Sequence, residues 1–146
     1  RGTNQPKTKS MKDYSDFRAD LEYGEEGEKI LDGLLHNQKI EVKRDRIAHR
    51  TGNYYFEYES HGKPSGFKTT TAGIWALMTD DCSFTLLVET NRLIEALRKF
   101  KAQCIATEQD ETETWAKRGG DGNTSVGVLI PANILIHQIL SHCKDR

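Results

Sequence analysis

The side chains best suited to chemistry in this sequence are carboxylates between residues 28 and 59, with lysine among them. The candidates for a joint role are Glu28, Lys43, Asp45, Glu57 and Glu59. Carboxylate oxygens are the ligands that Mg²⁺ and Mn²⁺ prefer, and such an ion can activate a water molecule for attack on a phosphodiester. Mg²⁺ keeps several of its waters, so a few carboxylates converging from different elements are enough. The pattern therefore indicates metal-dependent phosphodiester hydrolysis.

Glu28 lies in a segment, residues 22–36, whose apolar residues recur at helical spacing. The recurring residues are Ile30, Leu31, Leu34 and Leu35. Glu28 precedes Leu31 and Leu35 on the same side of such a helix, so we expect it at the border of the apolar stripe. Asn37 is a suitable end for the helix.

The other candidates lie on two predicted strands, residues 39–45 and 54–60, which are rich in β-branched and aromatic residues. Thr51-Gly52-Asn53 between them is a turn signal, so we expect a β-hairpin. The two-residue period of a strand puts Lys43 and Asp45 on one face of the first strand, and Glu57 and Glu59 on one face of the second. If this face packs toward Glu28 it forms a metal site, whereas a solvated face would carry only cross-strand ion pairs.

Further elements follow along the chain. A threonine run at 69–71 can cap a short helix containing Ile74, Trp75, Leu77 and Met78, and residues 83–89 predict a buried strand. Then come a helix starting near Thr90, a strand at 125–130 and a closing helix after Pro131. This order predicts the α/β class, with a mixed central β-sheet flanked by helices.

The order of these carboxylates along the chain resembles that of a known family, the PD-(D/E)XK or restriction-endonuclease-like nucleases. A helix with a glutamate, an aspartate on one strand and a Glu-x-Glu pair on the next strand follow the order of that family. Residues 24–28, GEEGE, are similar to a helix start in the Holliday-junction-resolvase branch, and residues 40–66 resemble small phage-type members. The resemblance implies a restriction-endonuclease-like core that cuts DNA.

The resemblance also implies roles for single residues. Asp45 would be the bridging metal ligand, Glu57 the second ligand and Glu28 an outer ligand through water. Glu59 stands where many members have lysine, so either Glu59 or Lys43 would orient the attacking water. In a second register, Glu41 and Lys43 would form the Glu-x-Lys pair, but no convincing strand aspartate precedes them.

These expectations define the hypothesis to be tested. The chain would be a DNA endonuclease using Mg²⁺ or Mn²⁺ on duplex or branched DNA, and it would act as a homodimer because two strands need two sites. Lys68 after the Pro-Ser-Gly loop and Lys117 with Arg118 beside two glycines are candidate DNA contacts. The alternative is a non-catalytic nucleic-acid-binding module on the same fold, and a third is an unrelated α/β interaction protein.

Composition is consistent with a soluble globular protein of 146 residues, with 36% hydrophobic and 29% charged residues. Residues 1–10 predict a flexible lead-in and 11–146 a single nuclease-like domain, with Met11 a candidate native start. No long apolar run and no secretory signal are present, so we expect the cytoplasm or the nucleoid of the host. Three cysteines without CxxC spacing argue against a disulfide framework or a zinc ribbon.

Overall fold

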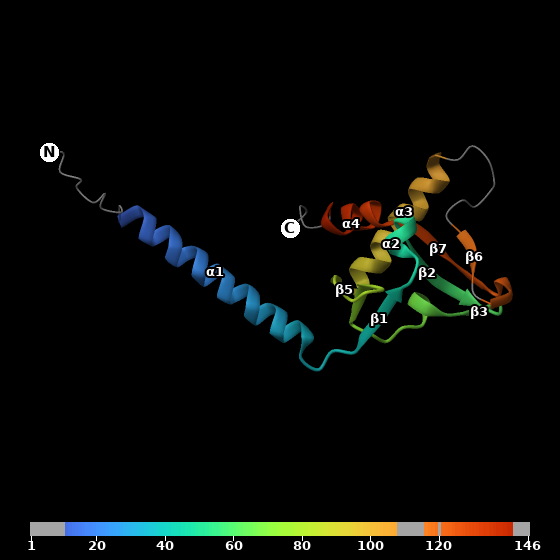
Figure 1. The fold of residues 1–146 in the computed structure, drawn as a ribbon, viewed down its shortest axis with the longest axis horizontal. Helices are drawn as coiled ribbons and strands as arrows, with labels where there is room; N and C mark the ends of the chain where they lie inside the picture. Colours follow the sequence, from blue (N-terminus) through green and yellow to red (C-terminus); the bar gives the residue numbers. More distant parts are fainter. Residues whose placement is uncertain (1–10, 108–115, 120, 142–146) are drawn as a thin grey trace. The chain divides into compact units, whose positions relative to one another are not determined.

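The computed structural model describes residues 11–107, 116–119 and 121–141, and the chain divides into two units, Arg1–Gln38 and Lys39–Arg146. In the first unit the described residues form helix α1 (Met11–Leu35), drawn in blue in Figure 1. The helix predicted over 22–36 is confirmed, although it starts earlier. Asn37 has a left-handed φ of 59°, as its predicted role in ending the helix requires. The lead-in predicted for residues 1–10 lies outside the described residues.

The described residues of the second unit form two sheets. In the three-stranded sheet, β4 (Ile74–Thr79) lies between β1 (Ile40–Asp45), to which it is parallel, and β5 (Thr85–Glu89), to which it is antiparallel. The second sheet is antiparallel, and its strand order is β3 (Lys63–Pro64), β2 (Asn53–Ser60), β7 (Ser125–Pro131) and β6 (Ala116–Gly119). The α/β class is thus confirmed, but the strands form two sheets instead of one central sheet.

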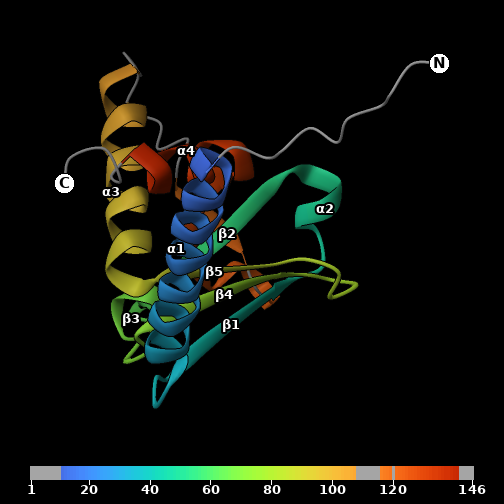
Figure 2. The ribbon, with the colours of Figure 1, turned by 90° about the vertical axis from the view of Figure 1, so that its left-hand side faces the viewer.

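The helical segments of this unit are α2 (Ala48–Thr51), η1 (Gly66–Lys68), α3 (Thr90–Thr107), η2 (Asp121–Asn123) and α4 (Ala132–Ser141). The two longer ones, α3 and α4, pack against each other, and Gln138 donates a hydrogen bond to Gln103 between them. Both also contact β7 (Figure 1), and Figure 2 shows α3 and α4 side by side. The predicted helix after Thr90, the strand at 125–130 and the closing helix are confirmed.

The predicted hairpin between β1 and β2 is wrong. Seven residues separate the strands, and part of this connection folds into α2 instead of a tight turn. Gly52 ends α2 with a φ of 69° and donates its N–H to the carbonyl of Ala48, so the turn signal belongs to a helix end. The strands pair elsewhere, β1 with β4 and β2 with β3 and β7.

The predicted short helix at residues 74–78 is also wrong, because this segment is strand β4. Its first four residues are buried, since β4 has neighbours on both edges and apolar side chains on both faces. A strand buried on both faces reads as a continuous apolar run, which lacks the alternation that distinguishes a strand from a helix.

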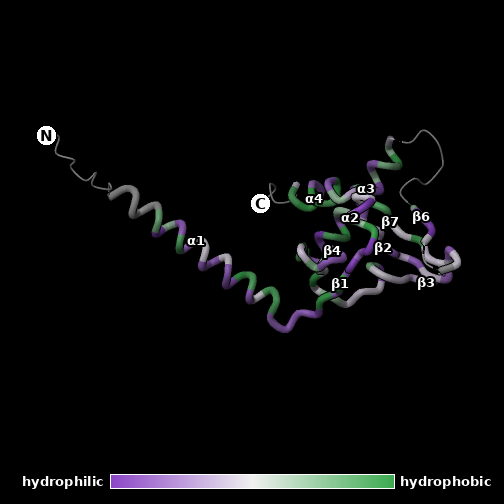
Figure 3. Tube along the Cα trace, viewed as in Figure 1, coloured by the Kyte–Doolittle hydropathy of each residue, from purple (hydrophilic) through white to green (hydrophobic). Residues whose placement is uncertain are grey.

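Both sheets and both longer helices contribute to one hydrophobic core. Phe56 of β2 and Trp75 of β4 form an edge-to-face pair with ring centroids 5.9 Å apart. The buried cluster contains Phe56, Trp75, Leu77, Val88, Leu93, Ala96, Leu97, Val128, Ile130 and Leu135. In contrast, hydrophobic and hydrophilic residues alternate along α1 (Figure 3). From Phe17 onward, all residues of α1 but the last are exposed.

The outer face of the antiparallel sheet depends on two glycines. Tyr55 lies over Gly119 and Gly127, and its hydroxyl donates to the carbonyl of Lys117 and bonds with the hydroxyl of Ser125. A Cβ added at Gly127 would lie 2.6 Å from both the Phe56 carbonyl oxygen and the Tyr55 ring. Gly119 was one of the two glycines that suggested a phosphate loop. In the structure it makes room for the Tyr55 ring.

A membrane-crossing helix is not found among residues 11–107, 116–119 and 121–141, because none of their helices is long and apolar enough.

This packing gives a first prediction. Gly127→Ala should lower the free energy of unfolding by about 1–3 kcal/mol, because the Phe56 backbone cannot move aside without disturbing the sheet. Urea denaturation followed by tryptophan fluorescence measures this. Gly33→Ala on α1 is the control, since a Cβ there has no neighbour within 4 Å. Equal losses in both variants would contradict the account.

Candidate functional site

Asp45 and Lys43 lie on one face of β1, as predicted from strand alternation. The Lys43 ammonium is 3.7 Å from one carboxylate oxygen of Asp45, and the exposed fractions of the two side chains are 26% and 12%. The other oxygen of Asp45 accepts hydrogen bonds from the backbone N–H groups of Ile47, at 2.9 Å, and Ala48, at 3.1 Å. Asp45 thus holds the start of α2.

The negative charge of Asp45 affects the pKa of Tyr54 on β2. Burial raises the pKa of the Tyr54 phenol, and the negative charge of Asp45 raises the same pKa further. Tyr54 shares its face of β2 with Phe56, which belongs to the core. The charge of Asp45 therefore acts on a phenol that shares its strand face with the core residue Phe56.

Glu57 lies on the opposite side of β2. It neighbours Phe56, which points into the core, and it pairs in register with Gly127 on the outer face. Its carboxylate accepts a hydrogen bond of 2.5 Å from the Ser65 hydroxyl. Glu59 follows a register shift in β2 and pairs with Val126 and Pro64. Because Val126 and Gly127 lie on opposite faces of β7, the prediction that Glu57 and Glu59 share a face is wrong.

The structure therefore brings Lys43 and Asp45 together, but it does not bring Glu57 to them. Glu28 lies on α1 in the first unit and is exposed there. Within the described part of the chain, no group of three His, Cys, Asp or Glu side chains lies close enough to hold a metal ion. The metal ligands inferred from the family resemblance stay a prediction.

Other carboxylates gather in the turn after β4. The Asp81 carboxylate accepts hydrogen bonds from the Thr79 hydroxyl at 2.6 Å and from the Ser83 hydroxyl and N–H. These bonds, that of Thr79 first, lower the pKa of Asp81 to about 2. Arg44 donates to the Asp80 carbonyl and lies 3.6 Å from its carboxylate. Both aspartates therefore have partners that stabilise the turn, namely Thr79 and Ser83 for Asp81 and Arg44 for Asp80.

A different part of the second unit contains a pocket of about 410 Å³. Its floor is apolar and includes Leu97 and Val128, which are 2% and 3% exposed. Aromatic side chains and three exposed cations surround this floor. The lining residues, which define the basic pocket, are Tyr58, Phe67, Lys68, Ile94, Leu97, Arg98, Lys101 and Val128.

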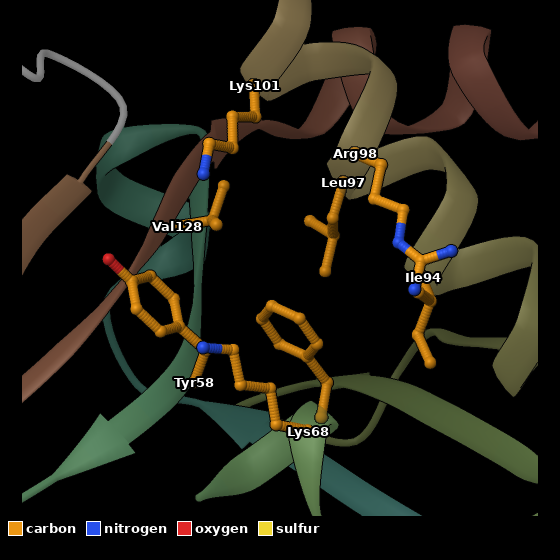
Figure 4. Close-up of a pocket in the computed structure, with 8 residues that line it drawn as sticks. Tyr58, Lys68, Ile94, Leu97, Arg98, Lys101 and Val128 are labelled. Carbon is orange, nitrogen blue, oxygen red and sulfur yellow. The ribbon is translucent and has the colours of Figure 1, made fainter. Parts of the chain in front are cut away.

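The lining residues of the basic pocket belong to β2, η1, α3 and β7, and Figure 4 draws them as sticks. The residues of α3 form one side, and Tyr58 of β2 and Lys68 of η1 lie opposite them. The Lys68 ammonium is 4.6 Å from the centre of the Tyr58 ring, a cation–π contact. The Tyr58 and Phe67 rings meet edge to face, with centroids 6.1 Å apart. All three charged residues among the described lining residues are cations.

The predicted DNA contacts have different positions. Lys68 lies at the basic pocket. Lys117 and Arg118 lie on strand β6 instead of in the predicted loop, and strand alternation puts them on opposite faces. Arg118 pairs with Val126 and so lies on the side of the sheet that includes Val128 of the pocket floor, whereas Lys117 pairs with Gly127 on the outer face.

Arg98, Lys101 and Phe67 were not singled out from the sequence. A usable signal was present, since the α3 residues of the basic pocket follow the spacing i, i+3, i+4 and i+7 that defines one helix face. That face changes from apolar, at Ile94 and Leu97, to cationic, at Arg98 and Lys101. Nothing local predicted that Phe67 would pack opposite it.

Comparisons of the chain with family models, with curated proteins and with solved structures find no match.

The position of Asp45 gives a second prediction. Asp45→Asn removes the charge that raises the Tyr54 pKa, so this pKa should fall toward the ordinary value of 10.0 without reaching it, because burial remains. A ¹³C NMR titration of the tyrosine ring carbons measures it. Glu57→Gln, on the other face of β2, should leave it unchanged. A Tyr54 pKa that moves equally in both variants would contradict the described faces.

Proposed function

We propose that this chain binds nucleic acid through the basic pocket. The observation that carries the proposal is the convergence of three cations from two elements, Lys68 of η1 and Arg98 and Lys101 of α3, over an apolar and aromatic floor. Nucleic acids supply the matching chemistry, since they place closely spaced negative phosphates next to flat apolar bases. This is the nucleic-acid-binding alternative considered from the sequence.

The support from electrostatics comes from the cations gathered at the basic pocket and not from the net charge of the chain. The chain as a whole carries a formal charge of −1, so attraction to a polyanion must come from how the charges are distributed. Arg118 lies on the pocket side of the antiparallel sheet, in the same cross-strand row as Val126 and Glu59. A backbone that crosses the rim of the basic pocket would meet several cations within one short stretch.

Arginine and lysine at the rim have distinct uses. The planar guanidinium of Arg98 can donate two parallel hydrogen bonds to a phosphate, whereas the ammonium groups of Lys68 and Lys101 act as point charges. Contacts of this kind position a backbone but do not read its sequence. We therefore propose binding with little sequence preference.

A third prediction tests the proposal. Replacing Lys68 and Arg98 together by alanine should weaken DNA binding and should reduce the slope of log affinity against log salt by about one for each lost phosphate contact. Fluorescence anisotropy at several salt concentrations measures both quantities. Arg50→Ala is the matched control, because Arg50 is exposed on α2, outside the pocket lining. Equal weakening by the control would mean that binding follows total charge and not the basic pocket.

The nuclease hypothesis stays a second candidate, with its restriction-endonuclease-like core, Mg²⁺ or Mn²⁺ dependence and homodimer. One observation favours it: the Lys43 ammonium lies 3.7 Å from the Asp45 carboxylate, where it could replace the lysine that many members of the family have at the position of Glu59. One observation weighs against it: the Glu57 carboxylate lies on the other side of β2 and accepts a hydrogen bond from Ser65 there.

The nuclease hypothesis makes a fourth prediction. With Mg²⁺ or Mn²⁺, the chain should cut supercoiled plasmid or a labelled four-way junction, and both Asp45→Asn and Glu57→Gln should abolish cutting. Gel electrophoresis of the products measures this, with Glu25→Gln on α1 as a control that should still cut. Cutting that survives in Asp45→Asn would remove Asp45 from the reaction. Binding without cutting under any metal would leave the binding module alone.

A further inference from the structure

The basic pocket is concave, and its size suits a small organic group such as a single base. Its volume of about 410 Å³ falls within the range of pockets that enclose one small organic group. In a duplex, each base is stacked between its neighbours and is paired, so no base is available to enter such a pocket. Unpaired strands can turn single bases outward onto protein side chains.

We infer that the basic pocket accepts one base of a single-stranded nucleic acid, which stacks on Phe67 while the rim cations contact the flanking phosphates. This inference rests on the proposed function and adds to it the class of strand. It assigns separate tasks to the two aromatic residues and to the cations, and each task follows from a described contact.

Phe67 is the aromatic residue assigned to stacking. The Tyr58 ring already has the Lys68 ammonium 4.6 Å from its centre, so Tyr58 serves to position that cation. The Phe67 ring is tilted by 62° from the Tyr58 ring, lines the pocket and is only partly buried. Stacking of a base on one aromatic ring contributes substantially to single-strand binding and tolerates any base, because every base has a flat face.

The pocket floor explains why stacking, not base recognition, would dominate. Leu97 and Val128 offer only aliphatic surface and are almost fully buried. Such surface excludes water from the inserted base but forms no hydrogen bonds with its edge. Discrimination between bases requires donors and acceptors at that edge, so the inferred site should bind unlike bases with similar affinity.

The experiment uses the full chain and fluorescein-labelled twelve-residue probes. These are oligo-dT, oligo-U, a chain of abasic residues that keeps the phosphates but lacks bases, and a hairpin duplex. Affinities are measured by anisotropy for the wild type, Phe67→Leu and Phe67→Tyr. Leucine keeps most of the volume without an aromatic face, and tyrosine keeps the ring. Thermal unfolding verifies that both variants fold.

The inference expects oligo-dT or oligo-U to bind the wild type at least about fivefold more tightly than the abasic chain. Phe67→Leu should remove most of that difference, and Phe67→Tyr should restore it. The abasic chain should bind all three proteins alike, because its phosphates still meet Lys68, Arg98 and Lys101.

Two results overturn the inference while leaving the proposed function in place. One is equal binding of abasic, duplex and single-stranded probes that still depends on Lys68 and Arg98. The other is a loss in Phe67→Leu that is the same for every probe. A third result also overturns the inference. If free dTMP competes as strongly as oligo-dT, the pocket binds a nucleotide and not a strand. If no probe binds, or if Lys68 and Arg98 are irrelevant to binding, the proposed function fails as well.

Discussion

Burial of α3 against both sheets decides where Arg98 and Lys101 of the basic pocket lie. Leu93, Ala96 and Leu97 are 0%, 1% and 2% exposed, and the helix contacts β4, β5, β7 and α4. Leu97 belongs to the hydrophobic core and also to the floor of the basic pocket. Because the apolar side of α3 is held by the core, Arg98 directly after Leu97 and Lys101 one turn later are held at the rim. The position of Arg98 and Lys101 at the rim thus depends on the hydrophobic packing of α3.

The opposite side of the basic pocket depends on a close approach between η1 and β2. Gly66 has a φ of 53°, and a Cβ at this position would collide with the carbonyl oxygen of Glu57. Just before it, the Ser65 hydroxyl donates to the Glu57 carboxylate. Both contacts bring the segment carrying Phe67 and Lys68 onto β2. In the structure Glu57 is therefore a positioning residue for the basic pocket, whatever further role it has.

The sequence predicted those elements whose evidence is local. The apolar spacing in α1, α3 and α4, and the strands at β1, β2, β5 and β7, could be read from short windows. The pairing of β1 with β4 could not, because it joins residues more than thirty positions apart and β4 has no alternation of its own. The same limit applies to the site. Alternation correctly put Lys43 beside Asp45 and Glu57 opposite Phe56, but it could not show that these faces belong to different sheets.

Asp45 shows why one pattern of residues supported two interpretations. An aspartate at the end of a strand can bind a metal ion, and it can equally accept the N–H groups of the following turn. Here one oxygen does the latter for Ile47 and Ala48, and the other faces Lys43. A metal ion would have to compete with the Lys43 ammonium for that second oxygen, without help from Glu57, whose carboxylate is bound to Ser65 across the strand. In the basic pocket, by contrast, the groups proposed for binding already converge. For this reason we propose recognition of nucleic acid at the basic pocket ahead of hydrolysis at Asp45.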